Sequence, residues 1–313
     1  MTKAMKRKTI AVLLLLVLLG ALPQVLPRFY IYVAAIVLLT GLLATSLNLA
    51  IGYGGIYQFH HAVFYGVGAY GTALMLTRCP LPAPLGFLAG PLASAALSLV
   101  MGLICIRLSK LYFGMLQISL GSLVWATVYR WYSFTGGDDG IHGVPLPGPI
   151  ASTEGAYYST LIVSAVCFFA LYRIVRSPFG KTLQGIRDNP VRSAAVGVDV
   201  KRHQLAALVI AGFFGGVAGS LFVVVDSSVF PDMMFWTYSL EVLVMCLLGG
   251  MYTFFGPLAG ASIIVILRVF ASVYTPYWSL LLGALLTLVI IFLPDGVLGY
   301  LVRRFGRKEG LRA

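Results

Sequence analysis

The chain has 313 residues, of which 59% are hydrophobic and only 10% charged, and its formal net charge is +12. Soluble domains are about 45–50% apolar and about 25% charged, so this composition excludes a soluble protein and leaves no room for a large soluble domain. The 22 Lys and Arg residues lie mainly in tails and in connections between apolar runs. Membrane topology therefore accounts for the charge, and no nucleic-acid partner is expected.

Apolar runs of membrane-spanning length follow one another along nearly the whole chain. A hydrocarbon core about 30 Å thick requires about 20 apolar residues at a helical rise of about 1.5 Å per residue. We therefore expect an all-α polytopic transmembrane helix bundle of about ten helices (8–10), forming a single transmembrane domain over residues 1–313. The expected helices are 10–26, 29–51, 58–77, 84–106, 112–131, 156–175, 204–225, 237–250, 256–273 and 278–293.

The first of these runs has a basic start that is typical of a signal peptide. It lacks a clean A-x-A cleavage site, which favours an uncleaved first helix. Other expected helices are rich in glycine: Gly66, Gly68 and Gly71 in one, and Gly212, Gly215, Gly216 and Gly219 in another. Small residues let helix backbones approach closely in lipid, so packing is the favoured interpretation and lining a solute path is the alternative.

The basic residues indicate which helix ends face the cytoplasm. With ten crossings and a cytoplasmic N-terminus, all but four of the 22 Lys and Arg residues fall on the cytoplasmic side. The four exceptions are Arg28, Arg78, Arg130 and Arg268. Because positive charge concentrates on the cytoplasmic side, the pattern supports an even number of crossings with both termini cytoplasmic. A polar connection at about 133–155 is then extracytoplasmic, and a basic one at about 177–203 is cytoplasmic.

The cytoplasmic connection carries helix-capping signals. Asn189 is a good N-cap, Pro190 suits the first helical position, and Gly197 suits a left-handed residue after the helix ends. The spacing predicts a short helix at roughly 190–196 after another at about 180–187. A helix this short is marginal alone in water, so a knob that fits a groove on a cytoplasmic partner would explain it. The alternative is a basic loop that fixes topology or lies on anionic lipid.

Sequence motifs in this connection are similar to those of a known family. Residues 180–189 (GKTLQGIRDN) and 194–198 (AAVGV) resemble the cytoplasmic coupling loop of the branched-chain amino acid ABC permeases, LivM-type subunit. Further resemblance to this family follows in the same order along the chain, at 47–70, 108–141, 239–261 and 292–299. Departures at 58–60 and 251–255 leave the solute open, because urea permeases share much of the pattern.

The resemblance implies a membrane-spanning subunit of an ATP-driven importer. Its coupling residues toward the ATPases would be Gly180, Arg187, Asp188, Asn189, Pro190, Arg192, Ala195 and Gly197. The implied partners are two cytoplasmic ATPase subunits, a second related permease subunit, an extracytoplasmic solute-binding protein and membrane lipid. ATP and Mg²⁺ would be bound by the ATPases, with no cofactor in this chain. The implied location is the bacterial inner membrane, as a multi-pass protein.

Polar residues within apolar runs are candidates for the substrate path, because they are costly in lipid. The candidates are Asn48, His61, Glu241, Gly249 and Gly250. Asn48 could instead pack between helices, and Glu241 could pair with Arg268. The adjacent His60 and His61 are expected near the cytoplasmic end of the third helix, pointing in different directions, so they do not predict a metal site.

Catalytic motifs are missing from the sequence. It has no P-loop, no HExxH and no Ser-His-Asp ordering, so the chain is expected not to be an enzyme and not to hydrolyse ATP. Besides the ABC permease, two other classes remain. An ion-coupled secondary transporter usually carries intramembrane acids and broken helices, and here Glu241 is almost the only such acid. An intramembrane enzyme would need a nucleophile–base or metal set, which cannot be assembled.

Overall fold

The computed structural model describes residues 19–79, 82–108, 110–274 and 296–305, together with 277, 280, 283–284, 287 and 292. It confirms the predicted all-α polytopic class. Six helical segments of this part are long and apolar enough to cross a membrane. They are α2 (Arg28–Asn48) with its extension η1 (Leu49–Tyr53), α4 (Ala83–Cys105), α5 (Lys110–Arg130), α7 (Thr153–Arg176), α10 (Val200–Asp226) and α12 (Gly256–Tyr274).

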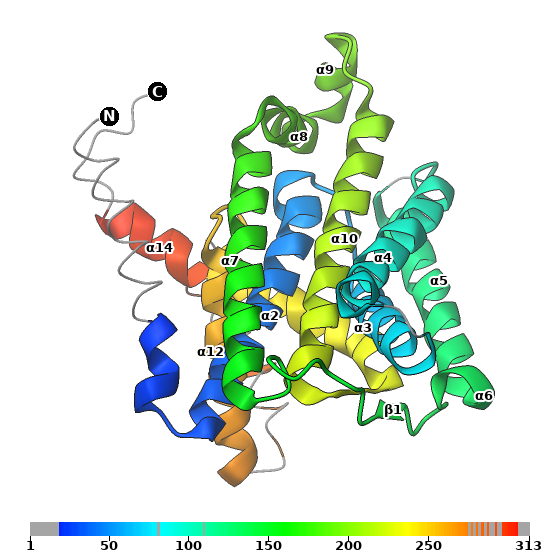
Figure 1. The fold of residues 1–313 in the computed structure, drawn as a ribbon. Helices are drawn as coiled ribbons and strands as arrows, with labels where there is room; N and C mark the ends of the chain where they lie inside the picture. Colours follow the sequence, from blue (N-terminus) through cyan, green and yellow to red (C-terminus); the bar gives the residue numbers. More distant parts are fainter. Residues whose placement is uncertain are drawn as a thin grey trace.

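Shorter elements connect these helices. They are α3 (Ala62–Arg78), α6 (Tyr132–Thr135), α8 (Pro178–Asp188), α9 (Pro190–Ala195), η2 (Pro231–Met234), α11 (Trp236–Gly249) and α14 (Gly296–Phe305). Two short strands, β1 (Ile141–His142) and β2 (Ser228–Val229), pair antiparallel with Ile141 opposite Val229. Figure 1 shows α8 and α9 at one end of the bundle and β1 at the opposite end. We call these the α8–α9 end and the β1 end.

Two predicted helices fall largely outside the described residues, namely 10–26 and 278–293. Within the first, residues 19–25 are helical. At the other end of the chain, α14 lies beyond the last predicted helix. The exact number of crossings therefore remains a prediction.

Glycine and serine residues let α3, α4 and α10 pack closely, as the sequence predicted. A Cβ atom built on Gly68 of α3 would lie 2.5 Å from the Cα atom of Gly216 on α10. The Oγ atom of Ser94 on α4 donates a hydrogen bond of 2.7 Å to the Phe64 carbonyl of α3. Such contacts replace the hydrophobic driving force that helices lack in lipid.

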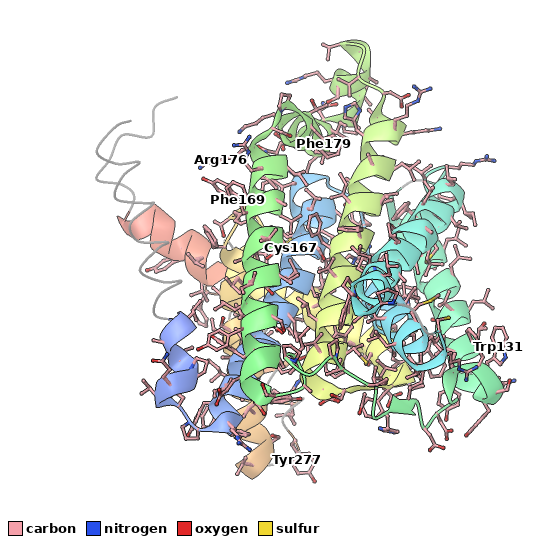
Figure 2. All side chains as sticks on the ribbon, in the orientation of Figure 1. Trp131, Cys167, Phe169, Arg176, Phe179 and Tyr277 are labelled. Atoms are coloured by element: carbon pink, nitrogen blue, oxygen red, sulfur yellow. The ribbon has the colours of Figure 1, made fainter. Side chains whose placement is uncertain are left out.

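The outer faces of the long helices are apolar. On α7, Phe169 is 63% exposed while Cys167 is turned into the bundle and 8% exposed, and Figure 2 shows them on different sides of the helix. Leu92 and Leu103 of α4 and Leu123 of α5 are likewise exposed. A surface of this kind is stable against hydrocarbon rather than water.

The predicted third helix, 58–77, is wrong at its start. After α2, the chain makes one π-helical segment, η1, and then runs without helix until α3 begins at Ala62. Gly52, Gly54 and Gly55 weaken helix propensity here, and Gly55 adopts φ +63°, which glycine reaches without steric cost. His60 and His61 therefore lie in or next to an irregular segment and not in the third helix.

Candidate functional site

Side-chain caps define the two short helices at the α8–α9 end. The Oδ1 atom of Asn189 accepts a hydrogen bond of 2.9 Å from the Arg192 backbone N–H, which makes Asn189 the N-cap of α9 as predicted. Gly197 follows the helix with φ +88°, the predicted left-handed conformation. The helix spans Pro190–Ala195, one residue shorter than expected.

The two helices differ in how they bury their side chains. In α8, Leu183 and Ile186 are buried in the body of the protein. In α9 no residue is buried, and Val191 and the adjacent Val196 are 78% and 76% exposed. Figure 1 shows α9 standing at the extreme end of the bundle. An apolar projection of this size, next to basic residues, has the form of a docking knob.

Arg187, at the end of α8, points toward the body of the protein. Its Nη1 atom donates a hydrogen bond of 2.8 Å to the Gly52 carbonyl in η1. Its Nη2 atom forms a 2.8 Å ion pair with Asp188. Its guanidinium carbon lies 5.2 Å from the ring centroid of Tyr252, in the connection between α11 and α12. One side chain thus joins the connection 177–203 to two other segments.

Asn48 lies one helical turn before Gly52. Its side chain is fully buried, and its Oδ1 atom lies against Gly52. Neither polar atom of the Asn48 amide has a hydrogen-bond partner among the described residues. The amide therefore lies next to the backbone group that Arg187 holds. Asn48 and Arg187 both contact Gly52, although the sequence assigned them to different sites.

His61 has partners on both ring nitrogens. Nε2 lies 2.8 Å from the Oγ atom of Ser46 on α2, and Nδ1 lies 2.7 Å from the Nε2 atom of Gln58. The neighbouring Ala62 N–H donates to the Ser239 Oγ atom of α11 at 2.9 Å. The His61 ring thus joins its own segment to α2, the Ala62 N–H joins the same segment to α11, and both ring nitrogens of His61 are already occupied.

Glu241 of α11 forms an ion pair with Arg268 of α12. The pairing that the sequence suggested for Glu241 is present, and its role in the substrate path stays a prediction. Gly249 and Gly250 make close backbone contacts, since a Cβ atom on Gly249 would collide with the Gly256 backbone. Gly250 has φ +110° and lies against Gly296. Both glycines therefore have packing roles.

Sequence reasoning missed Gln58, Gln117 and Tyr252. The two glutamines are 1% and 2% exposed. The signal that could have found them is the one that selected Asn48, a neutral amide within an apolar run. Tyr252 gave no such signal, because only the fold brings it to Arg187.

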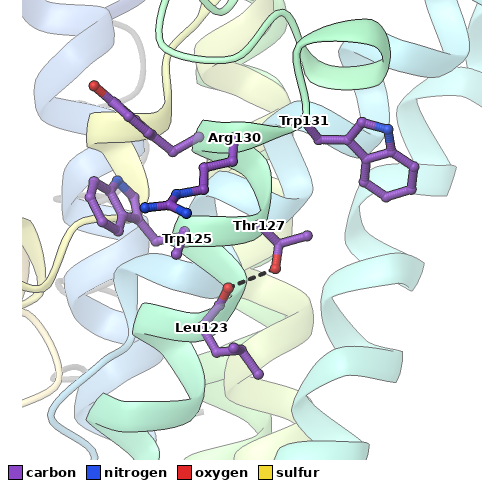
Figure 3. A pocket seen from close by; sticks show the side chains of 7 residues that line it. Leu123, Trp125, Thr127, Arg130 and Trp131 are labelled. Carbon is purple, nitrogen blue, oxygen red and sulfur yellow. Dashed lines mark hydrogen bonds between the residues drawn. The ribbon is translucent and has the colours of Figure 1, made fainter.

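A shallow groove of about 580 Å³ lies along the last turns of α5, near the β1 end. Its lining is Leu123, Trp125, Ala126, Thr127, Tyr129, Arg130 and Trp131. Figure 3 shows the Arg130 guanidinium beside the Trp125 ring, with Trp131 pointing to the other side. Tryptophan, tyrosine and arginine are enriched where helices leave the hydrocarbon, so this groove marks a membrane interface.

Comparison with known proteins identifies the relatives of this chain. A family model described as the branched-chain amino acid transport system, permease component, matches residues 29–290. The high-affinity branched-chain amino acid transport system permease protein LivM of Escherichia coli K12 is 27% identical over 316 residues, covering 91% of this chain and 73% of that protein. The probable branched-chain amino acid transport permease protein LivM of Methanocaldococcus jannaschii is 22% identical, covering 82% and 89%.

A shorter similarity involves a different solute. The guanosine ABC transporter permease protein NupQ of Bacillus subtilis is 24% identical over 83 residues, covering 26% of each chain. No solved structure matches the chain. Because the family model spans 29–290 of 313 residues, the chain belongs to the family of branched-chain amino acid transport system permease components.

Proposed function

We propose that this chain is the membrane-spanning permease subunit of an ABC importer that carries branched-chain amino acids across the bacterial inner membrane. The family match over residues 29–290 is the observation that carries this function. The LivM relatives named for the same solutes are similar over most of this chain, whereas the guanosine permease is similar over only 26% of it. The multi-pass location agrees with the six long apolar helices.

The α8–α9 end is the cytoplasmic end in this proposal, and α9 docks on the ATPase subunits. Seven basic residues lie between 173 and 202 at this end: Arg173, Arg176, Lys181, Arg187, Arg192, Lys201 and Arg202. This charge agrees with the positive-inside rule. The exposed valines Val191 and Val196 supply the apolar contact, and ATP with Mg²⁺ is held by the partner subunits.

Arg187 has a different role from the one that its position in the coupling motif implied. It is 27% exposed and turned toward η1 and Tyr252. It therefore transmits movement of α9 to the inner ends of α2 and α11, and its guanidinium does not form the docking contact itself. ATP binding on the partners would shift α8–α9 and reopen the helices on the other side of the membrane.

The complete transporter contains more chains than this one. We infer a second related permease subunit, two ATPases, and a solute-binding protein that meets the β1 end. The 133–155 connection there carries three acids, Asp138, Asp139 and Glu154. This connection contains β1, which pairs with β2 after α10. We therefore infer that the connection belongs to the single permease domain and is not a separate domain.

Reconstitution tests this function. The chain would be purified with its co-purifying partners, placed in proteoliposomes with the solute-binding protein, and supplied with ATP inside and labelled leucine or urea outside. Leucine uptake that requires ATP supports the proposal. Urea uptake without leucine uptake would instead support the alternative, a urea or amide ABC importer of the same family. Leucine uptake driven by an ion gradient in the absence of any ATPase would overturn the ABC assignment.

A further inference from the structure

The irregular segment 55–61 runs from Arg187 at the α8–α9 end into the depth of the membrane interior. Gly121 of α5 contacts the His60 ring so closely that a Cβ atom on Gly121 would overlap it. Gly121 is 11 residues from Lys110, the start of α5, which is about 16 Å along a helix and near the middle of a hydrocarbon core about 30 Å thick. Non-helical backbone at this depth occurs where it is buried in protein or lines a polar cavity.

The hydrogen bonds around His61 determine which side-chain atom of Gln58 lacks a hydrogen-bond partner. The Ser46 hydroxyl donates its proton to the Leu43 carbonyl at 2.7 Å, so toward His61 it accepts from Nε2–H. The Nδ1 atom of His61 is then the lone-pair acceptor, and the Gln58 amide nitrogen donates to it. Gln58 Oε1 remains, buried and without a partner among the described residues.

A second unpartnered amide oxygen lies on the helix that covers this segment. Gln117 of α5 is 2% exposed, and its Oε1 atom has no hydrogen-bond partner in the described part of the chain. It lies on the same face of α5 as Gly114 and Gly121, which contact Phe59 and His60. Residues three and four apart share a helix face, so Gln117 faces the segment between those two contacts.

We infer that the break between α2 and α3, with Gln58 and Gln117, is an intramembrane site that binds the α-ammonium group of the transported amino acid. Both unpartnered atoms are acceptors, and an ammonium group brings three N–H donors. Unpaired buried acceptors are costly, whereas a passing donor would satisfy them. This inference rests on the proposed function, because the solute class supplies the ammonium group.

The helix that covers this site is α5, which is mostly exposed on its other faces. It meets segment 57–60 at Gly114 and Gly121, where the Phe59 and His60 side chains lie against the helix. Tyr57 is 43% exposed beside it and stacks edge-on against Phe59 with ring centroids 6.2 Å apart. Displacement of α5 would therefore open the two amides to a solute.

Two substitutions of similar size at Gln117 test the inference. Gln117→Glu keeps an acceptor oxygen, whereas Gln117→Met removes it. In proteoliposomes of the complete transporter, we expect Gln117→Met to lower maximal leucine uptake at least tenfold and Gln117→Glu to keep at least half of it. A packing role predicts the reverse order, because Met fits an apolar site and a buried carboxylate does not. That reverse order, or equal uptake by both variants, would overturn the inference.

Ser119→Met is the matched control, since Ser119 lies on the exposed side of α5 two residues away. It should leave uptake unchanged. Complex assembly and the affinity of the solute-binding protein for leucine are measured in parallel and should be equal for all variants. If the unmodified transporter imports no aliphatic amino acid, the proposed function has failed. If it imports leucine and the Gln117 variants behave alike, only the site has failed.

Discussion

Arg187 on α8 donates a hydrogen bond of 2.8 Å to the backbone carbonyl of Gly52, 135 positions away in the chain. Gly52 lies in η1, one turn beyond Asn48, and Arg187 also faces the Tyr252 ring. The contact joins the short helices of the α8–α9 end to the place where the membrane helix becomes irregular.

Replacing Arg187 by methionine keeps most of the stem and removes the guanidinium. Hydrogen bonds to charged groups contribute about 1.5–3 kcal/mol, and 1.4 kcal/mol corresponds to a factor of about ten. We expect leucine uptake to fall about tenfold or more in Arg187→Met, while the complex assembles and still hydrolyses ATP. Uptake and ATP hydrolysis are measured on the same proteoliposomes.

The control for this change is Arg202→Met, whose side chain is 87% exposed and pairs only with Asp199 on the surface. Surface pairs contribute about 0–1 kcal/mol, so uptake should be unchanged. Unchanged uptake in Arg187→Met as well would mean that the contact with Gly52 transmits nothing.

Gly197→Val tests the docking role of α9 itself. Gly197 has φ +88° with nothing within 4 Å of an added Cβ atom, so the substitution acts through backbone strain alone. The left-handed region costs an L-residue about 1–2 kcal/mol, and more for a β-branched one. We expect the protein to insert normally, and ATP hydrolysis to lose its dependence on the loaded solute-binding protein.

Gly197→Asn is the matched control at the same position, because asparagine tolerates the left-handed conformation that valine does not. This variant adds a side chain without the backbone strain and should keep hydrolysis coupled to uptake. Normal coupling in Gly197→Val as well would remove the support for docking by α9.

The sequence was sufficient for the helical class and for α9, because their signals are local. Apolar runs determine membrane spans, and the N-cap Asn189 and the left-handed Gly197 act within a few residues. The break before α3 could not be predicted in the same way. Residues 58–61 precede an apolar run, and their pattern predicted a helix. The glycines in 52–55, the bond of His61 to Ser46 on α2 and the bond of the Ala62 N–H to Ser239 on α11 favour an irregular backbone instead.

The candidate site was predicted less completely than the fold. Arg187 was recognised by motif, but its direction depends on Gly52 and Tyr252, which are distant in sequence. His61 was expected to line a path, whereas Ser46 and Gln58 saturate both of its nitrogens. Contacts of this kind depend on tertiary packing, and neither spacing nor composition contains them.

Gly68→Ala tests the close packing of α3 against α10. A Cβ atom at Gly68 would collide with the Gly216 backbone, which cannot rotate away as a side chain could. Overpacking costs about 1–3 kcal/mol, so the unfolding midpoint in detergent should fall. Gly20→Ala is the control, because nothing lies within 4 Å of its Cβ position. If both variants have the same unfolding midpoint as the parent chain, the contact between Gly68 and Gly216 does not determine the helix spacing.

Variants of the Glu241–Arg268 pair distinguish a structural role from an ion-coupling role for Glu241, the one described acid in α11. Glu241 is 10% exposed and Arg268 35%. Removing one partner of a buried pair costs about 3–5 kcal/mol, and the exposure of Arg268 places Glu241→Leu toward the lower value. We expect the double variant Glu241→Leu/Arg268→Leu to recover part of this loss, since no charge is then left alone.

A double-mutant cycle of unfolding free energies measures the coupling, and uptake measured on the same variants tests the function. If the pair is structural, the double variant still imports leucine with ATP at a rate close to that of the parent. If the carboxylate of Glu241 carries a coupling ion, the double variant is inactive however stable it is. Because these outcomes separate stability from transport, they also decide whether ATP alone provides the energy for import through this chain.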